Sequence, residues 1–272
     1  MQLFSGVQNA QILDKQIALY LSKQAQNSIG TLGIIQVGND PASSKYTELK
    51  LNYCKKINIP AEYFKIDESL SDLEIGNKIE EITSISYLTS VILQLPLPRK
   101  SLDKLIQKIP PEKDVDCLLG TNFQFLQADS FKTKSRYSPI IRAGEYFLYS
   151  NNIKLARLET IIIGDGLLVG NPIKNYLISK GAIVKVIDNY KIGYKLVASL
   201  VILSTGISNL VKGEDLQDGC NVIDFGSSIL NGKTCGDLDM NSQLQHLGTI
   251  SPSPGGMGSL VIRFLVMNHL GI

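Results

Sequence analysis

The sequence predicts an α/β protein of two domains, each built on a parallel sheet. Short apolar runs that end in glycine or proline alternate with amphipathic segments along most of the chain, which is typical of parallel strands joined by crossover helices. The alternation breaks off over residues 120–150, where polar and basic residues suit a crossing between domains, and restarts near residue 160. A chain of 272 residues is also long enough for two ordinary domains.

The first half contains three expected strands, each followed by a helix. We expect a helix over 8–26, a strand over 31–38, a helix from Ser43 to about Asn58, a strand over 61–66, a helix from Ser71 to about residue 83, a strand over 90–94 and a short helix from Ser101 to Pro110. The three serines are assigned as N-caps because their hydroxyls can accept a hydrogen bond from a first-turn amide. Glu74, three positions after Ser71, completes a capping box.

The second half repeats the pattern after a connecting helix over about 143–149. We expect a strand over 160–163, a glycine loop over 164–170, a helix with Pro172 in its first turn and Gly181 at its end, strands over 182–187, 199–206 and 221–226, and a last helix over 259–270. These short strands closed by glycine again indicate a parallel sheet.

Composition and charge exclude several classes of function. The net charge is +2, with 19% charged residues and no long run of one sign, so neither nucleic acid nor a membrane surface is expected as a partner. No secretory signal and no apolar run of the ~18 residues of a membrane span are visible, so we expect a cytoplasmic protein. Four cysteines without metal-type spacing and only two histidines indicate no metal site and no histidine-based triad. Acid–base chemistry must then rest on lysine and carboxylates.

Lys50 stands out on the predicted 43–58 helix. At 100° per residue it falls within an apolar arc formed by Tyr46, Leu49, Tyr53, Cys54 and Ile57. A buried lysine must be paired or must titrate at lower pH, because desolvation disfavours its charged form. Lys50 is therefore a candidate for proton transfer or for polarising a bound group. The alternative is a lysine whose ammonium group reaches solvent at the edge of a core helix.

The glycine loop has the context of a dinucleotide-binding fingerprint. Gly164, Gly166 and Gly170 lie between a strand and a helix, and Asp188 follows about 20 residues later. Glycines there let the backbone approach a pyrophosphate at a helix N-terminus. The spacing G-x-G-x-x-x-G differs from the commoner G-x-G-x-x-G, so a tight turn without a ligand is the alternative. Asp188 would accept a hydrogen bond from a ribose 2′-hydroxyl and repel a 2′-phosphate, which favours NAD over NADP.

Further polar groups follow expected strands. Gln94 ends a buried strand, and Asp114 and Asp116 lie in a loop that could reach the same edge, where open α/β sheets bind ligands. Each could instead be an ordinary strand end or turn residue. The turn 254–256 either faces a ligand or only begins a helix. A Tyr-x-x-x-Lys pair also occurs in short-chain dehydrogenases, but there the glycine loop precedes the pair, and here the order is reversed.

Several motifs stand in one order along nearly the whole chain. They are VGNDPASSKYTELK (37–50), QLPLP (94–98), PEKDVD (111–116), VG-x-P (169–172), GDLD (236–239) and SPSPGGMG (251–258). In this order the chain resembles the bifunctional methylenetetrahydrofolate dehydrogenase/methenyltetrahydrofolate cyclohydrolases.

The resemblance implies a catalytic, folate-binding α/β domain over residues 1–138, completed by residues 257–272, and a Rossmann-type NAD(P)-binding domain over residues 139–256. It implies tetrahydrofolate derivatives as substrates, NADP as the family's cofactor, no metal, and a homodimer. Methylenetetrahydrofolate would be oxidised by hydride transfer to the nicotinamide. Water would then attack the methenyl cation and open the ring to formyltetrahydrofolate.

The resemblance also assigns the site residues. Lys50 corresponds to the family's essential lysine, Tyr46 to the ring that packs over the folate, and Gln94 to the lysine's hydrogen-bond partner. Asp116 corresponds to the carboxylate that binds the amino group of the pterin. The other expected site residues are Pro254, Gly255 and Gly256 on the substrate side, and Gly164, Asp165, Gly166, Gly170, Asp188 and Ser227 on the cofactor side.

The cofactor half departs from the family pattern. The family's Gly-Arg-Ser is Gly-Asp-Gly at residues 164–166, so the arginine and serine often used on the NADP 2′-phosphate are absent. Its His-Ser pair after the next strand is Asp-Asn at residues 188–189, and its Gly-Ile-Asn is Gly-Ser-Ser at residues 226–228.

These changes place two acids where the family binds a phosphate. A charge a few Å from a phosphate is disfavoured by about 1 kcal/mol or more at surface dielectrics, although Lys185 and Lys191 would offset this if they pointed inward. We therefore hypothesise weakened NADP use or a switch to NAD.

Three other functions compete with the bifunctional enzyme. A cyclohydrolase that has lost the dehydrogenase would reduce neither nucleotide, and a non-catalytic folate-binding or dimer-partner relic would be indifferent to loss of Lys50. An NAD dehydrogenase for an unrelated substrate would need a first domain without its folate motifs, which are present.

Overall fold

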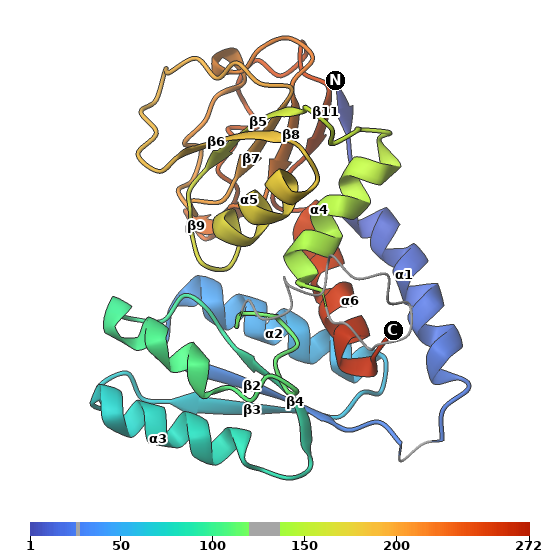
Figure 1. Cartoon of the computed structure of the whole chain (residues 1–272), viewed down its shortest axis with the longest axis vertical. Coiled ribbons are helices and arrows are strands. Elements are labelled where there is room, and N and C mark those ends of the chain that lie inside the picture. Colours follow the sequence, from blue (N-terminus) through green and yellow to red (C-terminus); the bar gives the residue numbers. More distant parts are fainter. Residues whose placement is uncertain (26–27, 120–136) are drawn as a thin grey trace. The chain divides into compact units, whose positions relative to one another are not determined.

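The computed structural model describes residues 1–25, 28–119 and 137–272 and divides into two compact units. Unit 1 consists of residues 1–13 and 140–263, and unit 2 consists of residues 14–139 and 264–272 (Figure 1). Each is an α/β unit built on parallel strands, which confirms the predicted fold class. Most of the expected crossing between domains lies outside the described residues.

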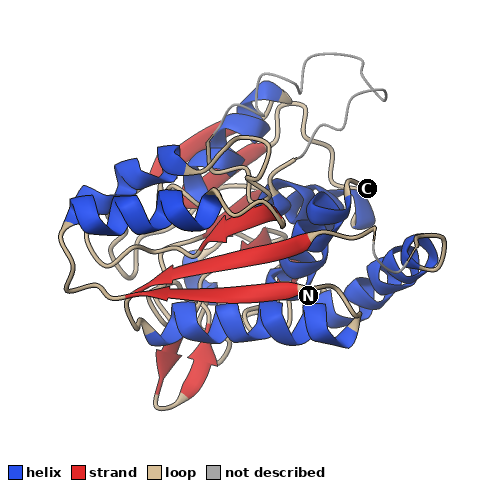
Figure 2. Ribbon diagram, turned by 90° about the horizontal axis from the view of Figure 1, so that it is seen from below, coloured by secondary structure: helices blue, strands red, loops and turns tan. Residues whose placement is uncertain are grey.

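Unit 2 is built on a three-stranded parallel sheet. Its strand order is β3 (Ala61–Ile66), β2 (Thr31–Val37), β4 (Leu88–Leu93). Helix α2 (Pro41–Lys56) covers one face and α3 (Asp72–Thr83) covers the other, while the 3-10 helix η1 (Lys100–Lys108) packs against α3 (Figures 1 and 2). Because both faces of the sheet are covered, the central strand β2 is buried beyond its first residue and reads in sequence as a continuous apolar run.

Helix α2 begins earlier than predicted, and the assignment of Ser43 as its N-cap is wrong. The N-cap is Asp40, whose carboxylate accepts a 2.7 Å hydrogen bond from the amide of Ser43. Pro41 occupies the first helical position, where its fixed φ suits the helix and its missing N–H leaves nothing unsatisfied. The helix therefore starts two residues before Ser43.

The other two serine caps of unit 2 differ in outcome. Ser71 and Glu74 form the predicted capping box in front of α3. The short helix before Pro110 is instead a 3-10 helix that begins after Arg99 without a side-chain cap, so the prediction of a Ser101 cap is wrong.

Unit 1 contains a six-stranded sheet in which every neighbouring pair is parallel. The order is β1-β11-β8-β7-β5-β6. The strands are β1 (Gln2–Leu3), β5 (Glu159–Ile163), β6 (Ile183–Ile187), β7 (Leu200–Leu203), β8 (Asn221–Asp224) and β11 (Thr249–Ser251). Helices α4 (Pro139–Ser150) and α5 (Gly170–Ser179), the 3-10 turn η3 (Gly213–Asp215) and the hairpin β9 (Ser228–Leu230), β10 (Lys233–Cys235) complete it. The carboxyl ends of β5 to β8 consequently meet at one edge.

The start of the chain belongs to unit 1, although the sequence assigned it to the first domain. Strand β1 pairs with β11, and the amide of Gly6 donates a 2.8 Å hydrogen bond to the carbonyl of Gly255. The compact units thus depart from the predicted domain limits at residues 1–13 and 257–263. Strands of two and three residues are too short to produce a recognisable apolar pattern, which is why β1 and β11 were not expected.

Two helices contribute residues to both units. They are α1 (Gly6–Leu21), which is shorter than the predicted 8–26, and α6 (Met257–Leu270). Within unit 2, Nδ2 of Asn268 in α6 donates a 2.8 Å hydrogen bond to the carbonyl of Val115, and Nδ1 of His269 lies 2.9 Å from Oγ of Ser90. The end of α6 is thereby fixed to the strands and loops of unit 2.

No helix within the described ranges 1–25, 28–119 and 137–272 is long and apolar enough to cross a membrane. The same ranges contain no group of three or more histidine, cysteine or acidic side chains arranged to hold a metal ion.

Candidate active site and nucleotide pocket

Lys50 lies on the buried face of α2, as its position in the helix predicts. The residues of this helix that are buried are Ser43, Thr47, Lys50, Tyr53 and Cys54. Leu49, which was expected in the same arc, is instead 44% exposed, because the buried stripe is narrower than the predicted one. Lys50 is only 7% exposed, so its ammonium group does not reach solvent at the edge of the core.

Lys50 and Gln94 form a buried hydrogen-bonded pair. Nζ of Lys50 donates to Oε1 of Gln94 at 2.8 Å, and Gln94 is 5% exposed. Gln94 directly follows β4, and its Nε2 donates to the carbonyl of Leu95 at 2.7 Å. The second bond orients the amide so that its oxygen faces the lysine. An amide oxygen holds the amine in place without adding a charge.

Asp116 is the charge that most strongly opposes the effect of burial on the pKa of Lys50. Burial lowers the pKa of Lys50 and raises that of Asp116, and the attraction between the two groups partly offsets both changes. Among the ion pairs of the described part of the chain, none joins Lys50 to Asp116. The two groups are therefore close enough to interact electrostatically, yet each keeps capacity for a further polar partner.

Asp114 and Asp116 are both buried in the loop that follows η1. Asp114 forms an isolated bridge with Val91 of β4, and the charge of Asp114 raises the pKa of Asp116 further. The structure thus brings this loop to the strand that precedes Gln94, as predicted. Tyr46 is half-buried and lies one helical turn before Lys50 on α2. Tyr46, Lys50, Gln94 and Asp116 all belong to unit 2.

The Pro254–Gly256 turn belongs to unit 1 and directly precedes α6. Gly255 has a φ of +102°, which favours glycine. A Cβ placed on Gly6 would lie 1.8 Å from the carbonyl oxygen of Gly256, so the start of α1 packs directly on this turn. The turn therefore serves as the start of a helix in the structure, which was one of its two interpretations.

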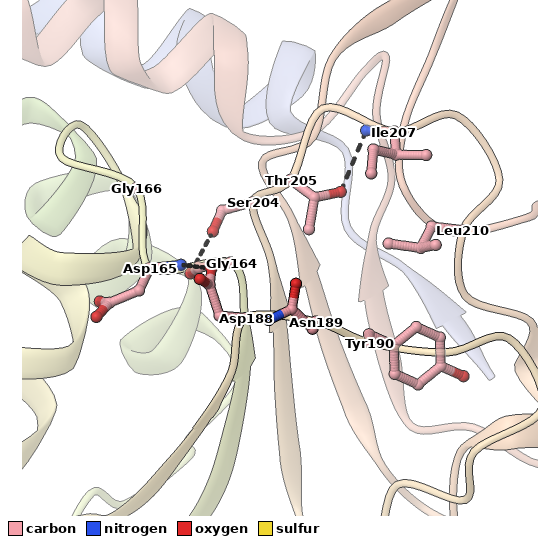
Figure 3. Close-up of a pocket in the computed structure, with 10 residues that line it drawn as sticks. All are labelled: Gly164, Asp165, Gly166, Asp188, Asn189, Tyr190, Ser204, Thr205, Ile207 and Leu210. Atoms are coloured by element: carbon pink, nitrogen blue, oxygen red, sulfur yellow. Dashed lines mark hydrogen bonds between the residues drawn. The ribbon is translucent and has the colours of Figure 1, made fainter. Parts of the chain in front are cut away.

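A pocket of about 390 Å³ opens at the carboxyl edge of the unit 1 sheet (Figure 3). Residues 164–166, 188–190, 204, 205, 207 and 210 line it. These segments follow β5, β6 and β7, and open α/β sheets bind their ligands at such an edge. Of the predicted cofactor residues, Gly164, Asp165, Gly166 and Asp188 line the pocket, whereas Gly170 and Ser227 do not.

The backbone conformation of the loop requires glycine at two of its three glycine positions. Gly164 has a φ of +93°, and a Cβ placed on Gly170 would lie 2.0 Å from the carbonyl oxygen of Gly164. Around Gly166, in contrast, no described atom lies within 4 Å of such a Cβ. Gly170 therefore shapes the loop from behind, and Gly166 leaves open space at the pocket.

The two acids of the pocket differ in their surroundings. Both carboxylate oxygens of Asp165 accept hydrogen bonds of 2.9 Å from Nζ of Lys174 in α5. Asp188 follows β6, is exposed, and accepts a weak 3.4 Å hydrogen bond from the amide of Asp165 (Figure 3). Lys174, rather than Lys185 or Lys191, offsets a charge here, and both of those lysines are exposed. Among the residues that the structure describes, no lysine forms an ion pair with Asp188, so its negative charge is not offset in this way.

Several contributors to this pocket were not expected from the sequence, among them Lys174, which binds the lining residue Asp165, and Thr205. Lys174 is one of many surface lysines and gains significance only from its position in the second turn of α5. Thr205 follows β7 and lines the pocket, and its only sequence signal is the glycine at position 206.

Comparison with known proteins covers almost the whole chain. Residues 4–116 match the family model of the tetrahydrofolate dehydrogenase/cyclohydrolase catalytic domain, and residues 142–272 match that of the NAD(P)-binding domain. The chain is 30% identical over 270 residues to "Bifunctional protein FolD" of Aquifex aeolicus, which covers 95% of this chain and 91% of that protein. It is 31% identical over 280 residues to the protein of the same name from Mycoplasmopsis synoviae, covering 100% and 99% of the two chains.

A solved structure agrees with these relatives. The bifunctional FolD methylenetetrahydrofolate dehydrogenase/cyclohydrolase of Campylobacter jejuni superposes with a TM-score of 0.82 at 26% identity, over 99% of this chain and 97% of that one. The motifs, the two α/β units and these matches lead to one conclusion: the chain belongs to the tetrahydrofolate dehydrogenase/cyclohydrolase family and is a bifunctional methylenetetrahydrofolate dehydrogenase and methenyltetrahydrofolate cyclohydrolase of one-carbon metabolism.

Proposed function

We propose that Lys50 transfers the protons of the cyclohydrolase step and that Gln94 holds its amine in position. The observation that carries this proposal is the buried 2.8 Å hydrogen bond between the two side chains. Because burial lowers the pKa of Lys50, its neutral amine is available at lower pH than that of a surface lysine. A neutral amine can accept a proton, which a solvated ammonium group cannot.

The chemistry requires both protons to leave the attacking water and one proton to reach the departing ring nitrogen. A bound nicotinamide nucleotide would supply the hydride acceptor for the methylene carbon, and the loss of hydride would leave the methenyl cation. Water then adds to that carbon and loses a proton, which Lys50 accepts. The resulting ammonium returns a proton to the departing ring nitrogen, the C–N bond breaks, and the hydroxyl group loses its proton to solvent as the carbonyl of the formyl product forms. General acid–base assistance of this kind is typically worth about 10²–10⁴ in rate.

We assign the remaining folate contacts to Tyr46, Asp116 and the Pro254–Gly256 turn. Tyr46 shares a helical face with Lys50, so its ring can stack on the folate while the amine reaches the reacting carbon. The buried carboxylate of Asp116 can accept hydrogen bonds from the amino group of the pterin, which would compensate for its burial. The turn would contribute backbone groups.

For the cofactor we propose a preference for NAD over NADP, with Gly164, Asp165, Gly166, Gly170, Asp188 and Ser227 as its binding residues. Asp188 carries the argument, because its exposed carboxylate would accept the ribose 2′-hydroxyl and repel a 2′-phosphate. The charge of Asp165 weighs less against a 2′-phosphate, because its carboxylate is paired with Lys174. A homodimer, a cytoplasmic location, and catalytic and nucleotide domains with limits near residues 138 and 256 remain predictions.

The experiment is the formation of methenyltetrahydrofolate from methylenetetrahydrofolate with saturating NAD or NADP, together with hydrolysis of methenyltetrahydrofolate. Both are measured for the wild-type enzyme and for Lys50→Met. The matched control is Lys56→Met, which removes an exposed lysine of the same helix.

We expect faster dehydrogenation with NAD than with NADP, and a loss of hydrolysis of about 10²-fold or more in Lys50→Met alone. Equal hydrolysis by Lys50→Met and the wild-type enzyme would overturn the role of Lys50. Tighter binding of NADP than of NAD by about tenfold would overturn the cofactor preference. Live hydrolysis without reduction of either nucleotide would leave a cyclohydrolase only.

A further inference from the structure

A buried aspartate outside the pocket fixes one of the pocket walls. The wall is the turn 204–207, which follows β7 and contributes Ser204, Thr205 and Ile207 to the lining (Figure 3). Oδ2 of Asp237 accepts three hydrogen bonds from this turn: 2.6 Å from the amide of Thr205, 2.8 Å from its hydroxyl and 3.3 Å from the amide of Gly206. Asp237 itself is fully buried.

The backbone around Asp237 is held in turn by a second aspartate. Oδ1 of Asp224, at the end of β8, accepts hydrogen bonds from the amides of Gly226 and Asp237 at 2.8 Å and 3.3 Å. Its Oδ2 accepts one from the amide of Leu238 at 3.0 Å. Asp224 thus connects the turn after β8 to the backbone of Asp237. The side chain of Asp237 in turn connects this backbone to the turn after β7.

Two glycines allow these carboxylates to approach the backbone so closely. A Cβ placed on Gly226 would lie 2.0 Å from Oδ1 of Asp237, and one placed on Gly236 would lie 2.1 Å from Oδ2 of Asp224. Gly226 begins the Gly-Ser-Ser sequence at residues 226–228, and Gly236 begins the Gly-Asp-Leu-Asp sequence at residues 236–239. No larger residue fits at either position without displacing a carboxylate.

Fold stability alone is a poor reason for this arrangement. Burial raises the pKa of both aspartates, which shows that their charged forms are disfavoured inside the unit. Oδ1 of Asp237 also has no hydrogen-bond partner among the residues that the structure describes. Well-packed apolar side chains are often at least as stabilising as buried charges, so the charge is better explained by what it holds.

We propose that Asp237 is a positioning residue for the nicotinamide nucleotide. It holds the amides of Thr205 and Gly206 and the Thr205 hydroxyl in one orientation, so that the pocket wall is fixed before the nucleotide binds. This inference rests on the proposed nucleotide site in unit 1. Preorganised walls of this kind affect binding of the ligand, because otherwise the turn must be ordered when the ligand binds.

The test compares Asp237→Asn with Asp239→Asn, whose side chain accepts a 3.0 Å hydrogen bond from the amide of Asn241, a residue that does not line the pocket. An asparagine keeps the shape but offers one neutral acceptor oxygen in place of a carboxylate. We expect Asp237→Asn to raise the KM and the Kd for the preferred nucleotide about tenfold, with a change in kcat of about threefold or less. Hydrolysis of methenyltetrahydrofolate needs no nucleotide and serves as the folding control.

A second pair of variants covers the case in which Asp237→Asn does not fold. Thr205→Val removes the donor hydroxyl and keeps the side-chain shape, whereas Thr205→Ser keeps the hydroxyl. We expect the nucleotide KM to rise about threefold or more for valine and to stay near the wild-type value for serine. Combining Thr205→Val with Asp237→Asn should add less than the sum of the two single effects.

The outcomes separate this proposal from the proposed function. An unchanged nucleotide Kd in Asp237→Asn, or equal effects of the valine and serine variants, overturns the positioning role. If the wild-type enzyme reduces neither nucleotide, direct titration with NADH still decides the role of Asp237, while the dehydrogenase assignment fails separately.

Discussion

Nζ of Lys50 and Oε1 of Gln94 are joined by a 2.8 Å hydrogen bond, and both side chains are almost completely buried. The partner of the lysine is thus a neutral amide, which leaves the amine able to lose its proton. A carboxylate in the same place would stabilise the ammonium form and remove the base. With a neutral residue at position 94, burial lowers the pKa of Lys50 and the charge of Asp116 partly opposes this effect.

Replacing Gln94 with glutamate should move the pH dependence of hydrolysis. The new charge raises the pKa of Lys50, so the part of the profile that requires the neutral amine shifts to higher pH. A shift of one pKa unit lowers the rate on that limb about tenfold at a fixed pH. The measurement is the pH–rate profile of methenyl hydrolysis. Gln107→Glu, which adds the same charge at an exposed position of unit 2, is the control. Coincident profiles for Gln94→Glu and the wild-type enzyme would contradict the proposed role of the pair.

Replacing Asp188 with serine should relax the selection against NADP. Loss of the carboxylate removes its repulsion of a 2′-phosphate, so the KM for NADP should fall about tenfold. The KM for NAD should rise, because serine is a weaker acceptor for the ribose 2′-hydroxyl. Steady-state kinetics with both nucleotides provide the measurement, and Asp218→Asn removes an exposed charge of the same unit as the control. An unchanged ratio of the two KM values would show that Asp188 does not face the ribose.

Replacing Gly170 with alanine should distort the glycine loop, which impairs the dehydrogenase activity and leaves the cyclohydrolase activity unchanged. The added Cβ would lie 2.0 Å from the carbonyl oxygen of Gly164, so the backbone must shift. We expect kcat/KM for the nucleotide to fall about tenfold or more, while methenyl hydrolysis is retained. Gly144→Ala is the control, because a Cβ there would lie 3.9 Å from Cδ1 of Ile173, with no closer atom in the described part of the chain outside its own helix. Full dehydrogenase activity in Gly170→Ala would mean that the loop does not carry the nucleotide.

The local elements and the buried lysine could be predicted because their signals lie within a few residues. Apolar runs identify β2, β4 and β5, and helical spacing places Lys50 on the inner face of α2. The same spacing misplaced Leu49, since helical periodicity gives the direction of a face and not its width. The Asp40 cap was missed because Asn39 to Ser44 contains several residues capable of capping.

Other features depend on residues that only the fold brings together. The contact between Asp237 and Thr205 joins residues 32 positions apart, and the pairing of β1 with β11 joins the start of the chain to residues near 250. No local pattern predicts either. Lys174 was missed for the same reason, since its partner Asp165 lies in the preceding loop.

Asp224 should make the stability of the protein depend on pH near neutrality. Burial raises the pKa of Asp224 to about 7, the charge of Asp237 adds to this effect, and backbone amides oppose it. Because the folded-state pKa lies above the unfolded value, this group contributes most stability at low pH, and the contribution is lost as the pH rises through about 7. Between pH 6 and 8 the free energy of unfolding should fall by about 1 kcal/mol from this group.

Urea unfolding of the wild-type enzyme and of Asp224→Asn at both pH values tests this expectation. The comparison uses the difference between pH 6 and pH 8 within each protein, because the substitution also weakens hydrogen bonds to backbone amides. The asparagine variant should show a smaller difference than the wild-type enzyme. Equal differences would mean that Asp224 does not bind a proton in this range.

The exchange of chain ends between the two units has a consequence for biosynthesis. Unit 2 contains Lys50 and Gln94 but also residues 264–272, which are translated after all of unit 1. The contacts of Asn268 with Val115 and of His269 with Ser90 cannot form while those residues are still within the ribosome. Most of unit 2 is therefore synthesised well before the residues that complete it, and a nascent chain truncated at residue 263 should expose the surface of unit 2 that residues 264–272 normally cover.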